Sequence, residues 1–382
     1  MFDVSVVGCA DYQYENVRRA LEEALCEIDG LAFVKEGMTV GLKANLVSFA
    51  SPDKAVTTHP VVLKVLCDLL REKGARVIIG DSPGGLYNAA FVTKVYRACG
   101  LYELEGEGVE LNMDFSQKEA TFPEAKVAHR FSYTSYLDRC DAIINVCKLK
   151  THGMMSMSCA TKNLFGVVPG TMKPEYHFRY PTYEQFADMI VDLNDYFRPV
   201  LSVCDAIVGM EGNGPTAGVP RPIGCVLASP SSHKLDLVAA SIIGLSVDEV
   251  PTLQSAVARG YAPSTVEELS VYGDYKSFFI SDYDNISTRH SLGFSGTSNN
   301  VLMNMFGRIA KSCLNSRPKL KKKECVGCNL CGQICPAKAI VIVKGKAIID
   351  TKKCIRCFCC QEFCPKGAMK VHRTWIAKLL NK

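Results

Sequence analysis

Nine of the 19 cysteines in this 382-residue sequence fall between residues 325 and 364, and eight of them form two runs with one spacing. The runs are Cys325-x-x-Cys328-x-x-Cys331-x-x-x-Cys335-Pro336 and Cys354-x-x-Cys357-x-x-Cys360-x-x-x-Cys364-Pro365. Thiolates at these spacings hold the iron atoms of [4Fe–4S] clusters. A disulfide scaffold is disfavoured, because such scaffolds occur in short secreted chains. The two runs therefore predict iron–sulfur chemistry.

The region from Cys325 to Cys364 resembles the bacterial two-cluster ferredoxins, in which the fourth cysteine of each run binds the other cluster. The resemblance implies two [4Fe–4S] clusters and a small α+β fold, with short strands at 339–343 and 346–349. The implied ligand sets are Cys325, Cys328, Cys331 and Cys364 for one cluster, and Cys354, Cys357, Cys360 and Cys335 for the other. Zinc is the alternative, but zinc usually takes four ligands in two separated pairs. Cys359 fits neither set and is expected to pack beside a cluster.

Charge divides the chain near Arg317. Residues 317–382 hold 16 Lys and Arg against 3 Asp and Glu, whereas the preceding residues hold 28 against 36. This asymmetry predicts two domains, 1–316 and 317–382, with the Ser- and Asn-rich segment 284–316 as a connector. The basic domain is expected to dock the acidic domain or a redox protein that donates or accepts electrons. Nucleic-acid binding is not expected, because no groove-reading or base-stacking motif is present.

Composition excludes several classes of protein. With 48% hydrophobic and 22% charged residues, the chain can form a packed core and is not disordered throughout. No apolar run reaches the roughly 18 residues of a membrane span. The first ten residues lack the basic region of a secretory signal. We therefore expect a cytoplasmic protein that does not contact a membrane.

Residues 1–316 alternate between strand-like and helix-like patterns, which predicts an α/β domain. Its sheet should be mostly parallel, with helices on both faces. Strands are predicted at 4–7, 40–43, 75–80, 142–146, 200–208 and 223–228. Helices are predicted at 15–28, 59–73, 88–99, 182–197, 232–243 and 251–259, the second of them capped by Thr58. Ligands of such sheets bind at the carboxyl ends of the strands.

Polar side chains follow several of these predicted strands. Converging lysines would bind a small anion such as a carboxylate or phosphate. A lysine crowded by other cations can act as a base or nucleophile, and a histidine can transfer protons. The candidate catalytic residues are Lys148, His152 and Lys162. The candidate substrate-binding residues are Lys43, Asn45, Asp81, Lys150, Asn163, His177, Asp205 and Glu211. The alternatives are solvated surface lysines, a loop role for His152 and simple packing of His177.

Several of these residues belong to segments that resemble a known family, the domain of unknown function 362. The segments are Lys43-Ala44-Asn45, Thr57-Thr58-His59-Pro60, Gly80-Asp81-Ser82-Pro83-Gly84, Lys148-Leu149-Lys150-Thr151-His152, Lys162-Asn163-Leu164-Phe165-Gly166 and Glu211-Gly212-Asn213-Gly214-Pro215. Members of that family are described as iron–sulfur proteins and occur fused to ferredoxin domains. The resemblance implies the same fusion here, and it implies no particular reaction.

Three functions are consistent with these features. The leading hypothesis is an iron–sulfur oxidoreductase of an anaerobe or facultative anaerobe, which relays electrons between two clusters and an anionic ligand in the α/β domain. The second is a pure electron carrier whose α/β domain docks a protein partner. The third is a non-redox enzyme that abstracts a proton next to a carboxylate and uses the clusters for structure or sensing. A further cofactor in the α/β domain stays open, although no Walker, dinucleotide-binding or flavin motif is recognisable. Cys147 and Cys159 flank the candidate site and could be reactive or ligating.

Overall fold

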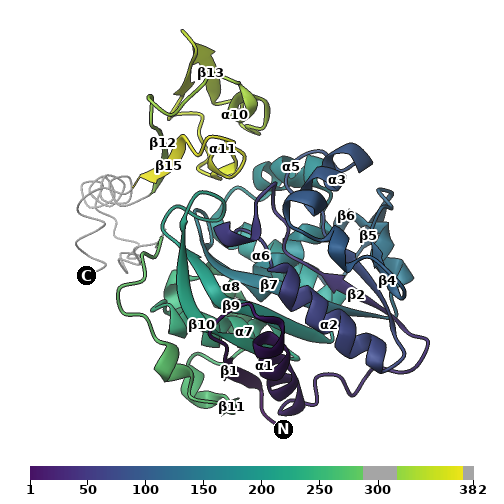
Figure 1. The fold of residues 1–382 in the computed structure, drawn as a ribbon. Coiled ribbons are helices and arrows are strands. Elements are labelled where there is room, and N and C mark those ends of the chain that lie inside the picture. The colour runs from purple at the N-terminus through teal and green to yellow at the C-terminus, as the bar shows by residue number, and fades with distance from the viewer. Residues whose placement is uncertain (287–315, 373–382) are drawn as a thin grey trace.

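The computed structural model describes residues 1–286 and 316–372. Almost all of the predicted connector 284–316 lies outside the described residues. In the described part of the chain, no helix is long and apolar enough to cross a membrane. The α/β part and the small C-terminal part contact each other directly (Figure 1).

The larger part contains a nine-stranded mixed sheet. Its strands are β1 (Val4–Gly8), β2 (Thr39–Lys43), β3 (Arg76–Gly80), β4 (Val109–Leu111), β7 (Ala142–His152), β8 (Ser156–Ser158), β9 (Leu201–Glu211), β10 (Val219–Ser229) and β11 (Val271–Tyr272). The order is β11-β1-β10-β9-β7-β2-β3-β4, and β8 pairs with β7. The run from β9 to β4 is parallel, whereas β10 is antiparallel to both of its neighbours. A hairpin of β5 (Gln117–Thr121) and β6 (Arg130–Thr134) forms a separate sheet.

Helices cover both faces of this sheet, which confirms the predicted architecture (Figure 1). One face carries α1 (Tyr14–Cys26), α2 (Pro60–Glu72) and α3 (Ala89–Ala98). The other carries α4 (Ala160–Asn163), α5 (Lys173–Arg179), α6 (Tyr183–Phe197), α7 (Ser232–Ile242) and α8 (Pro251–Ala258). The apolar residues predicted at helical spacing in α1, including Val17, Leu21 and Ala24, are buried in the core.

Two details differ from the predictions. The strand expected at 142–146 continues to His152, because β8 folds back on its second half and supplies hydrogen-bond partners there. Lys148, Lys150 and His152 therefore lie within β7 rather than after it. Thr58 does not cap α2: the cap is His59, whose Nδ1 accepts from the backbone N–H of Val61, while the Thr58 hydroxyl donates to the carbonyl of Val146.

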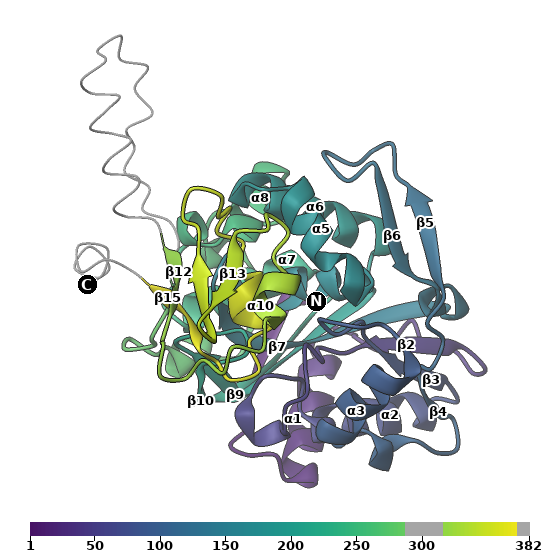
Figure 2. The same cartoon turned by 90° about the horizontal axis from the view of Figure 1, so that it is seen from above.

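The C-terminal part is a small domain of short antiparallel strand pairs and two one-turn helices. The pairs are β12 (Arg317–Leu320) with β15 (Met369–His372), and β13 (Ile340–Val343) with β14 (Lys346–Ile349). The helices are α10 (Leu330–Gln333) and α11 (Cys359–Glu362). Seen from above, this domain lies over the part of the α/β domain that contains β7, β9 and β10, and it leaves α1 to α3 uncovered (Figure 2).

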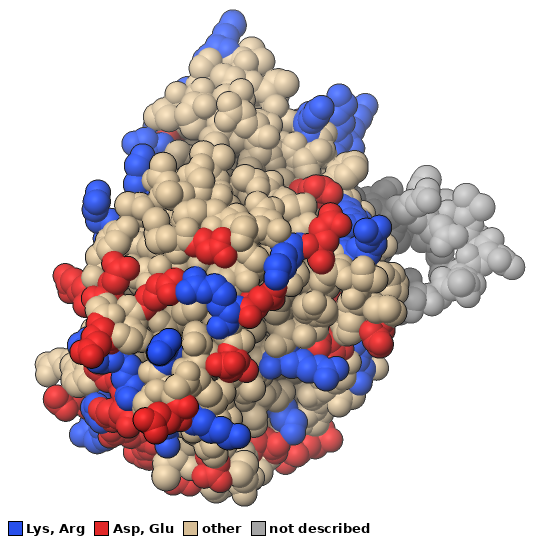
Figure 3. Space-filling model, turned by 90° about the vertical axis from the view of Figure 1, so that its right-hand side faces the viewer, with Lys and Arg blue, Asp and Glu red and all other residues tan. Residues whose placement is uncertain are grey.

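The surface charge differs between the two parts. In Figure 3 the charged side chains of the C-terminal domain, at the top, are mostly Lys and Arg, whereas the α/β domain below it shows both signs. This matches the charge asymmetry of the sequence.

Candidate functional site

Two cavities in the C-terminal domain are lined by cysteine side chains. The first is lined by Cys325, Cys328, Cys331 and Cys364, and the second by Cys335, Cys354, Cys357, Cys359 and Cys360. Each cavity thus holds one of the two four-cysteine sets that the sequence predicts, and Cys359 lies beside the second. Four thiols around one cavity are the donor set that a [4Fe–4S] cluster requires, so the residues fit the cofactor.

The backbone turns that aim these cysteines are repeated in the two runs. Asn329 and Phe358, each directly after the second cysteine of its run, have φ angles of 63° and 62° and precede α10 and α11. The backbone N–H groups of Ala339 and Ala368 donate to the sulfur of the fourth cysteine of each run, at 3.3 and 3.2 Å. Such hydrogen bonds stabilise the charge on the sulfur and tune cluster potentials.

Four lysines gather beneath the C-terminal domain and form what we term the lysine cluster: Lys43, Lys150, Lys162 and Lys173. Lys150 and Lys162 interact electrostatically, and so do Lys43, Lys162 and Lys173 with one another. The ammonium groups of Lys162 and Lys173 lie over the ring of Phe165, at 4.7 and 5.8 Å from its centroid. Four cations so close together attract an anion.

The Lys43 ammonium forms an ion pair at the carboxyl ends of two neighbouring strands. Lys43 ends β2 and Asp81 follows β3, and their charged atoms lie 2.8 Å apart in a fully buried ion pair. The Asp81 carboxylate also accepts from the backbone N–H of Leu46 at 2.7 Å. A Cβ atom at residue 166 would lie 2.2 Å from Asp81 and 2.4 Å from the Lys43 ammonium, so a larger residue would displace the side chains of this pair.

A network of amide side chains connects the lysines. The Asn163 carbonyl oxygen accepts from Lys43 Nζ at 3.1 Å and from Asn45 Nδ2 at 2.7 Å. Lys150 Nζ donates to the Asn45 carbonyl oxygen at 2.6 Å. Asn163 Nδ2 in turn donates to Asn145 at 2.8 Å. These bonds fix the side chains of β2, β7 and α4 relative to one another, so the arrangement is preorganised.

Lys148 belongs to a separate ion pair. Its ammonium lies 2.8 Å from the carboxylate of Asp205 and 2.8 Å from the hydroxyl of Tyr12. Tyr12 also donates to Asp205 and stacks on His59, with ring centroids 3.6 Å apart. Lys148 is buried and contacts both Asp205 and Tyr12. It therefore joins β7 and β9 to the loop between β1 and α1, which carries Tyr12.

Above the lysine cluster lie three buried polar atoms: His152 Nε2, His177 Nδ1 and Glu362 Oε1. His152 Nδ1 accepts from the backbone N–H groups of Met154 and Met155, both at 3.1 Å. Its Nε2 therefore faces the Glu362 carboxylate, 3.1 Å away. His177 Nδ1 has no hydrogen-bond partner in the described chain, and a buried polar atom without one marks a place where water or a ligand completes the site.

Glu362 comes from the C-terminal domain, between Cys360 and Cys364. Two residues span at most about 7 Å of chain, so this carboxylate lies close to ligands of both predicted clusters. Gln361, its neighbour, donates to the carbonyls of Asn213 and Gly214 at 2.9 and 3.2 Å. The hydroxyl of Thr216 donates to the carbonyl of Glu362 at 3.1 Å. The segment that carries the fourth and third cysteines of the second run is thus anchored on the α/β domain.

The docking surface consists largely of motif residues that the sequence singled out. Asn213 also accepts, through its side-chain oxygen, from the backbone N–H of Val371 at 2.9 Å. Phe358 is 1% exposed and packs into an apolar cluster of the α/β domain. None of these contacts involves a Lys or Arg of the C-terminal domain. The expected docking of the two domains is present, but apolar contacts, amide hydrogen bonds and the Glu362–His152 pair make it, not the basic side chains.

Burial lowers the pKa of every lysine in the cluster. For Lys150 burial acts first, the nearby charges of Lys162 and Lys148 add to it, and the pKa falls to about 7. Burial also lowers the pKa of Lys173 to about 7, against the attraction of Asp81. The pKa of His177 falls to about 3 because of burial, so this ring is neutral. Lysines that titrate near neutral pH are suited to acid–base chemistry.

The structure brings together most of the residues that the sequence nominated. Lys43, Asn45, Asp81, Lys150, His152, Lys162, Asn163 and His177 form one connected region. Lys148 and Asp205 lie in the adjoining pair. Glu211 stands apart: its carboxylate pairs with Arg221 at 3.6 Å and accepts from the backbone N–H of Asp284. His177 stacks on Phe186, with centroids 4.2 Å apart, so it packs as well as facing the site.

Three residues of this region are not among the candidate site residues that the sequence predicts: Asn145, Lys173 and Glu362. For Glu362 a signal was present, since it is the only acidic residue after Asp350 in a strongly basic segment. It also stands two residues after the third cysteine of its run, where the first run has Gln333. Lys173 lies outside the family motifs, in a Pro-containing segment whose helix is short.

Two family models match the chain. The model described as domain of unknown function DUF362 matches residues 40–241, which is more than half of the sequence. The chain belongs to this family. A second model, described as a 4Fe-4S dicluster domain, matches residues 317–365 of this DUF362 protein. The predicted fusion is thereby confirmed, and the C-terminal domain is a [4Fe–4S]-binding electron-transfer domain.

Two known proteins are similar to this DUF362 protein. The thylakoid-associated protein sll1697 of Synechocystis sp. is 30% identical over 273 residues, which cover 69% of this chain and 81% of that protein. The lactate racemase apoprotein of Thermoanaerobacterium thermosaccharolyticum has 12% sequence identity and a TM-score of 0.40. That alignment covers 62% of this chain and 56% of the racemase chain, little more than half of it. At this TM-score the likeness does not establish a shared fold.

Proposed function

We propose that the protein is an iron–sulfur oxidoreductase in which two [4Fe–4S] clusters exchange electrons with a small anionic ligand bound at the lysine cluster. The observation that carries this proposal is the position of Glu362. Its backbone lies between Cys360 and Cys364, and its carboxylate lies 3.1 Å from His152 beside the lysine cluster. The electron-transfer domain and the anion-attracting site therefore meet at one residue.

The number of clusters and their ligands are part of the proposal. The two cavities, each lined by one four-cysteine set, support a pair of clusters rather than one. When bound, the clusters would supply or accept single electrons, and two of them allow two-electron chemistry. Cys364 and Cys360 belong to different sets, so both clusters would have a ligand within two residues of Glu362.

The charge of the site supports an anionic ligand. Lys43, Lys150, Lys162 and Lys173 face two carboxylates, Asp81 and Glu362, which leaves the site positive when all four lysines are protonated. Lys162 has no ion pair or hydrogen bond in the described structure and is held only over aromatic rings. A carboxylate or phosphate group of a ligand would complete its coordination.

The chain's own residues would bind the ligand and manage protons. Lys162 and Lys173 would hold the anionic group, while Asn163 and Asn45 keep Lys43 and Lys150 oriented. His152 accepts two backbone N–H bonds at Nδ1, so its proton resides on Nε2, toward the site. This histidine could give or take a proton there as electrons move. The docked C-terminal domain covers part of the site.

A redox protein would serve as the external electron donor or acceptor. The basic surface of the C-terminal domain favours an acidic partner. A cytoplasmic location and an anaerobic host remain predictions from the sequence. A pure electron carrier is the alternative, and it predicts that no small ligand binds at the lysine cluster.

Anaerobic native mass spectrometry of the intact protein tests the proposal. The expected mass exceeds that of the chain by two [4Fe–4S] clusters, and a retained small anion that disappears in Lys162→Met supports the oxidoreductase. Lys94→Met, an exposed lysine of α3, serves as the matched control and should retain that anion. A mass for zinc alone overturns the cluster assignment. Two clusters without any anion, even after incubation with sulfate or acetate, would favour the electron carrier.

A further inference from the structure

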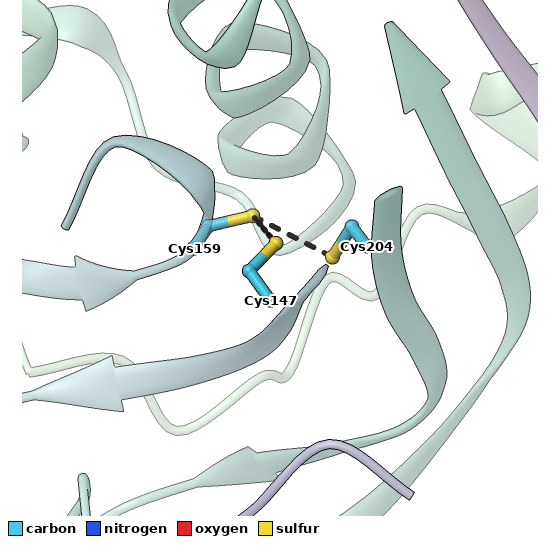
Figure 4. Close-up of side chains that lie close together, drawn as sticks. All are labelled: Cys147, Cys159 and Cys204. Atoms are coloured by element: carbon cyan, nitrogen blue, oxygen red, sulfur yellow. Dashed lines mark hydrogen bonds between the residues drawn. The ribbon is translucent and has the colours of Figure 1, made fainter. Parts of the chain in front are cut away.

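A second group of reactive side chains lies in the core between the sheet and α7. It consists of three cysteines, Cys147, Cys159 and Cys204, which belong to none of the family motifs (Figure 4). Their sulfur atoms point toward one another. Cys147 and Cys159 lie 3.6 Å apart, Cys159 and Cys204 lie 3.5 Å apart, and all three sulfurs lie within 4.8 Å of one another.

The fold explains why these sulfurs converge. Cys147 of β7 and Cys204 of β9 are register partners in a parallel pair, so both side chains project from the same face of the sheet. Cys159 directly precedes α4, after β8 has folded back along β7. Three separate segments thus contribute one thiol each, and the arrangement does not depend on a flexible loop.

The three thiols have no access to solvent. Their exposed fractions are 0%, 1% and 0%, and they are part of an apolar cluster. Asp236 is the nearby acidic side chain, but its two oxygens already accept from the backbone N–H groups of Ala160 and Thr161, at 2.7 and 3.0 Å. An ion bound here would therefore have three sulfur ligands and no oxygen ligand from that carboxylate.

We propose that Cys147, Cys159 and Cys204 form a three-coordinate thiolate site for one soft d10 metal ion, with monovalent copper as the ion that suits it best. Metal–sulfur bonds of about 2.3 Å place three sulfurs of one ion roughly 3.8–4.0 Å apart, so the two pairs at 3.5 and 3.6 Å need to open by only a few tenths of an ångström. Soft thiolates select such ions, whereas structural zinc prefers four ligands. A disulfide would need a far larger shift, to about 2.05 Å.

Metal binding at this site exchanges thiol protons for the ion. The metal forms bonds to sulfur, the thiol protons leave to solvent, and no electron is transferred. The site is independent of the lysine cluster and of the proposed oxidoreductase activity.

The test uses the intact, cluster-loaded protein under anaerobic conditions with one equivalent of Cu(I), buffered by a competing chelator. Native mass spectrometry should show one copper in addition to the clusters, and X-ray absorption should show three sulfur neighbours. Cys204→Ser should weaken copper binding at least 100-fold. Cys67→Ser, which replaces a buried core thiol of α2, should leave it unchanged.

Two further variants keep the result decisive. Cys147→Ser and Cys159→Ser should each lose the copper while retaining the cluster iron and the circular dichroism of the parent. The proposal is overturned if the wild-type protein takes up no copper, or if the copper persists in all three serine variants. It is also overturned if copper enters only by displacing cluster iron, because the cysteines of the C-terminal domain would then be the ligands.

Discussion

The carboxylate of Glu362 lies 3.1 Å from Nε2 of His152, and it is the charged contact between the electron-transfer domain and the α/β domain in the described structure. The histidine ends β7, and the glutamate ends α11 within the second cysteine run. Both atoms are buried, and within the described chain each faces the other. The pair therefore joins the part of the chain that carries electrons to the part that attracts anions.

Removal of the Glu362 charge should strengthen anion binding. In Glu362→Gln the side chain keeps its size, but the carboxylate no longer competes with a ligand for the lysines. The affinity for sulfate, measured by calorimetry on the anaerobic protein, is expected to rise about tenfold, which corresponds to about 1.4 kcal/mol. Glu324→Gln, which changes an acidic residue of the same domain that pairs with Lys321, is the control. A weaker affinity in Glu362→Gln would show instead that the glutamate helps to bind the anion.

Sulfate affinity should fall as the pH rises from 6 to 8.5. The pKa of Lys150 and that of Lys173 are both lowered to about 7, mainly by burial, so both lysines are charged at the lower pH and largely neutral at the higher. Sulfate itself does not titrate in this range. Lys150→Met should flatten the profile and lower the affinity at pH 6. A profile that rises with pH would contradict the assignment of these lysines to the anion site.

Gly166→Ala should destabilise the α/β domain. The added Cβ would lie 2.2 Å from Asp81 and 2.4 Å from the Lys43 ammonium, so the two side chains of the buried ion pair must shift together or move apart. Breaking such a pair costs about 3 kcal/mol or more. The denaturation midpoint, followed by circular dichroism, is the measurement. Gly106→Ala, where a Cβ meets no atom within 4 Å, should leave the midpoint unchanged; equal midpoints for the two variants would refute the tight packing.

Asn213→Ala should loosen the docking of the C-terminal domain without loss of iron. The side chain accepts from the backbone N–H of Val371, and the backbone carbonyls of Asn213 and Gly214 accept from Gln361. Hydrogen exchange in residues 358–372 is therefore expected to increase severalfold, while cluster absorbance stays constant. Asn16→Ala on α1 provides the comparison. Unchanged exchange in Asn213→Ala would mean that the apolar contact of Phe358 holds the domain by itself.

Much of the fold was predictable because its signals are local. The helices and strands of the α/β domain follow apolar periodicity, and the cysteine runs reveal their cofactor through spacing alone. The length of β7 was not predictable, since its second half pairs with β8, a strand of three residues with no pattern of its own. For the same reason Lys148 and Lys150 were expected after the strand rather than inside it.

The candidate site was predictable only in part. Lys43, Asp81 and Asn163 were predicted as site residues because they lie at or after the ends of predicted strands, and the carboxyl ends of parallel strands lie together. The contribution of Glu362 depends on how the two domains dock, and no spacing within either domain encodes that contact. The burial of Lys150 and the separation of Glu211 from the lysines likewise arise from tertiary packing.

Redox-linked anion binding is the central claim, and an anaerobic potentiometric titration followed by EPR tests it most directly. A sulfate bound at the lysine cluster adds negative charge beside the clusters and opposes their reduction. The midpoint potential of at least one cluster should therefore fall with sulfate in the wild-type protein and in Lys94→Met, but not in Lys162→Met. Identical potentials with and without saturating sulfate in the wild-type protein would contradict the account, because the clusters and the lysine cluster would then not be coupled.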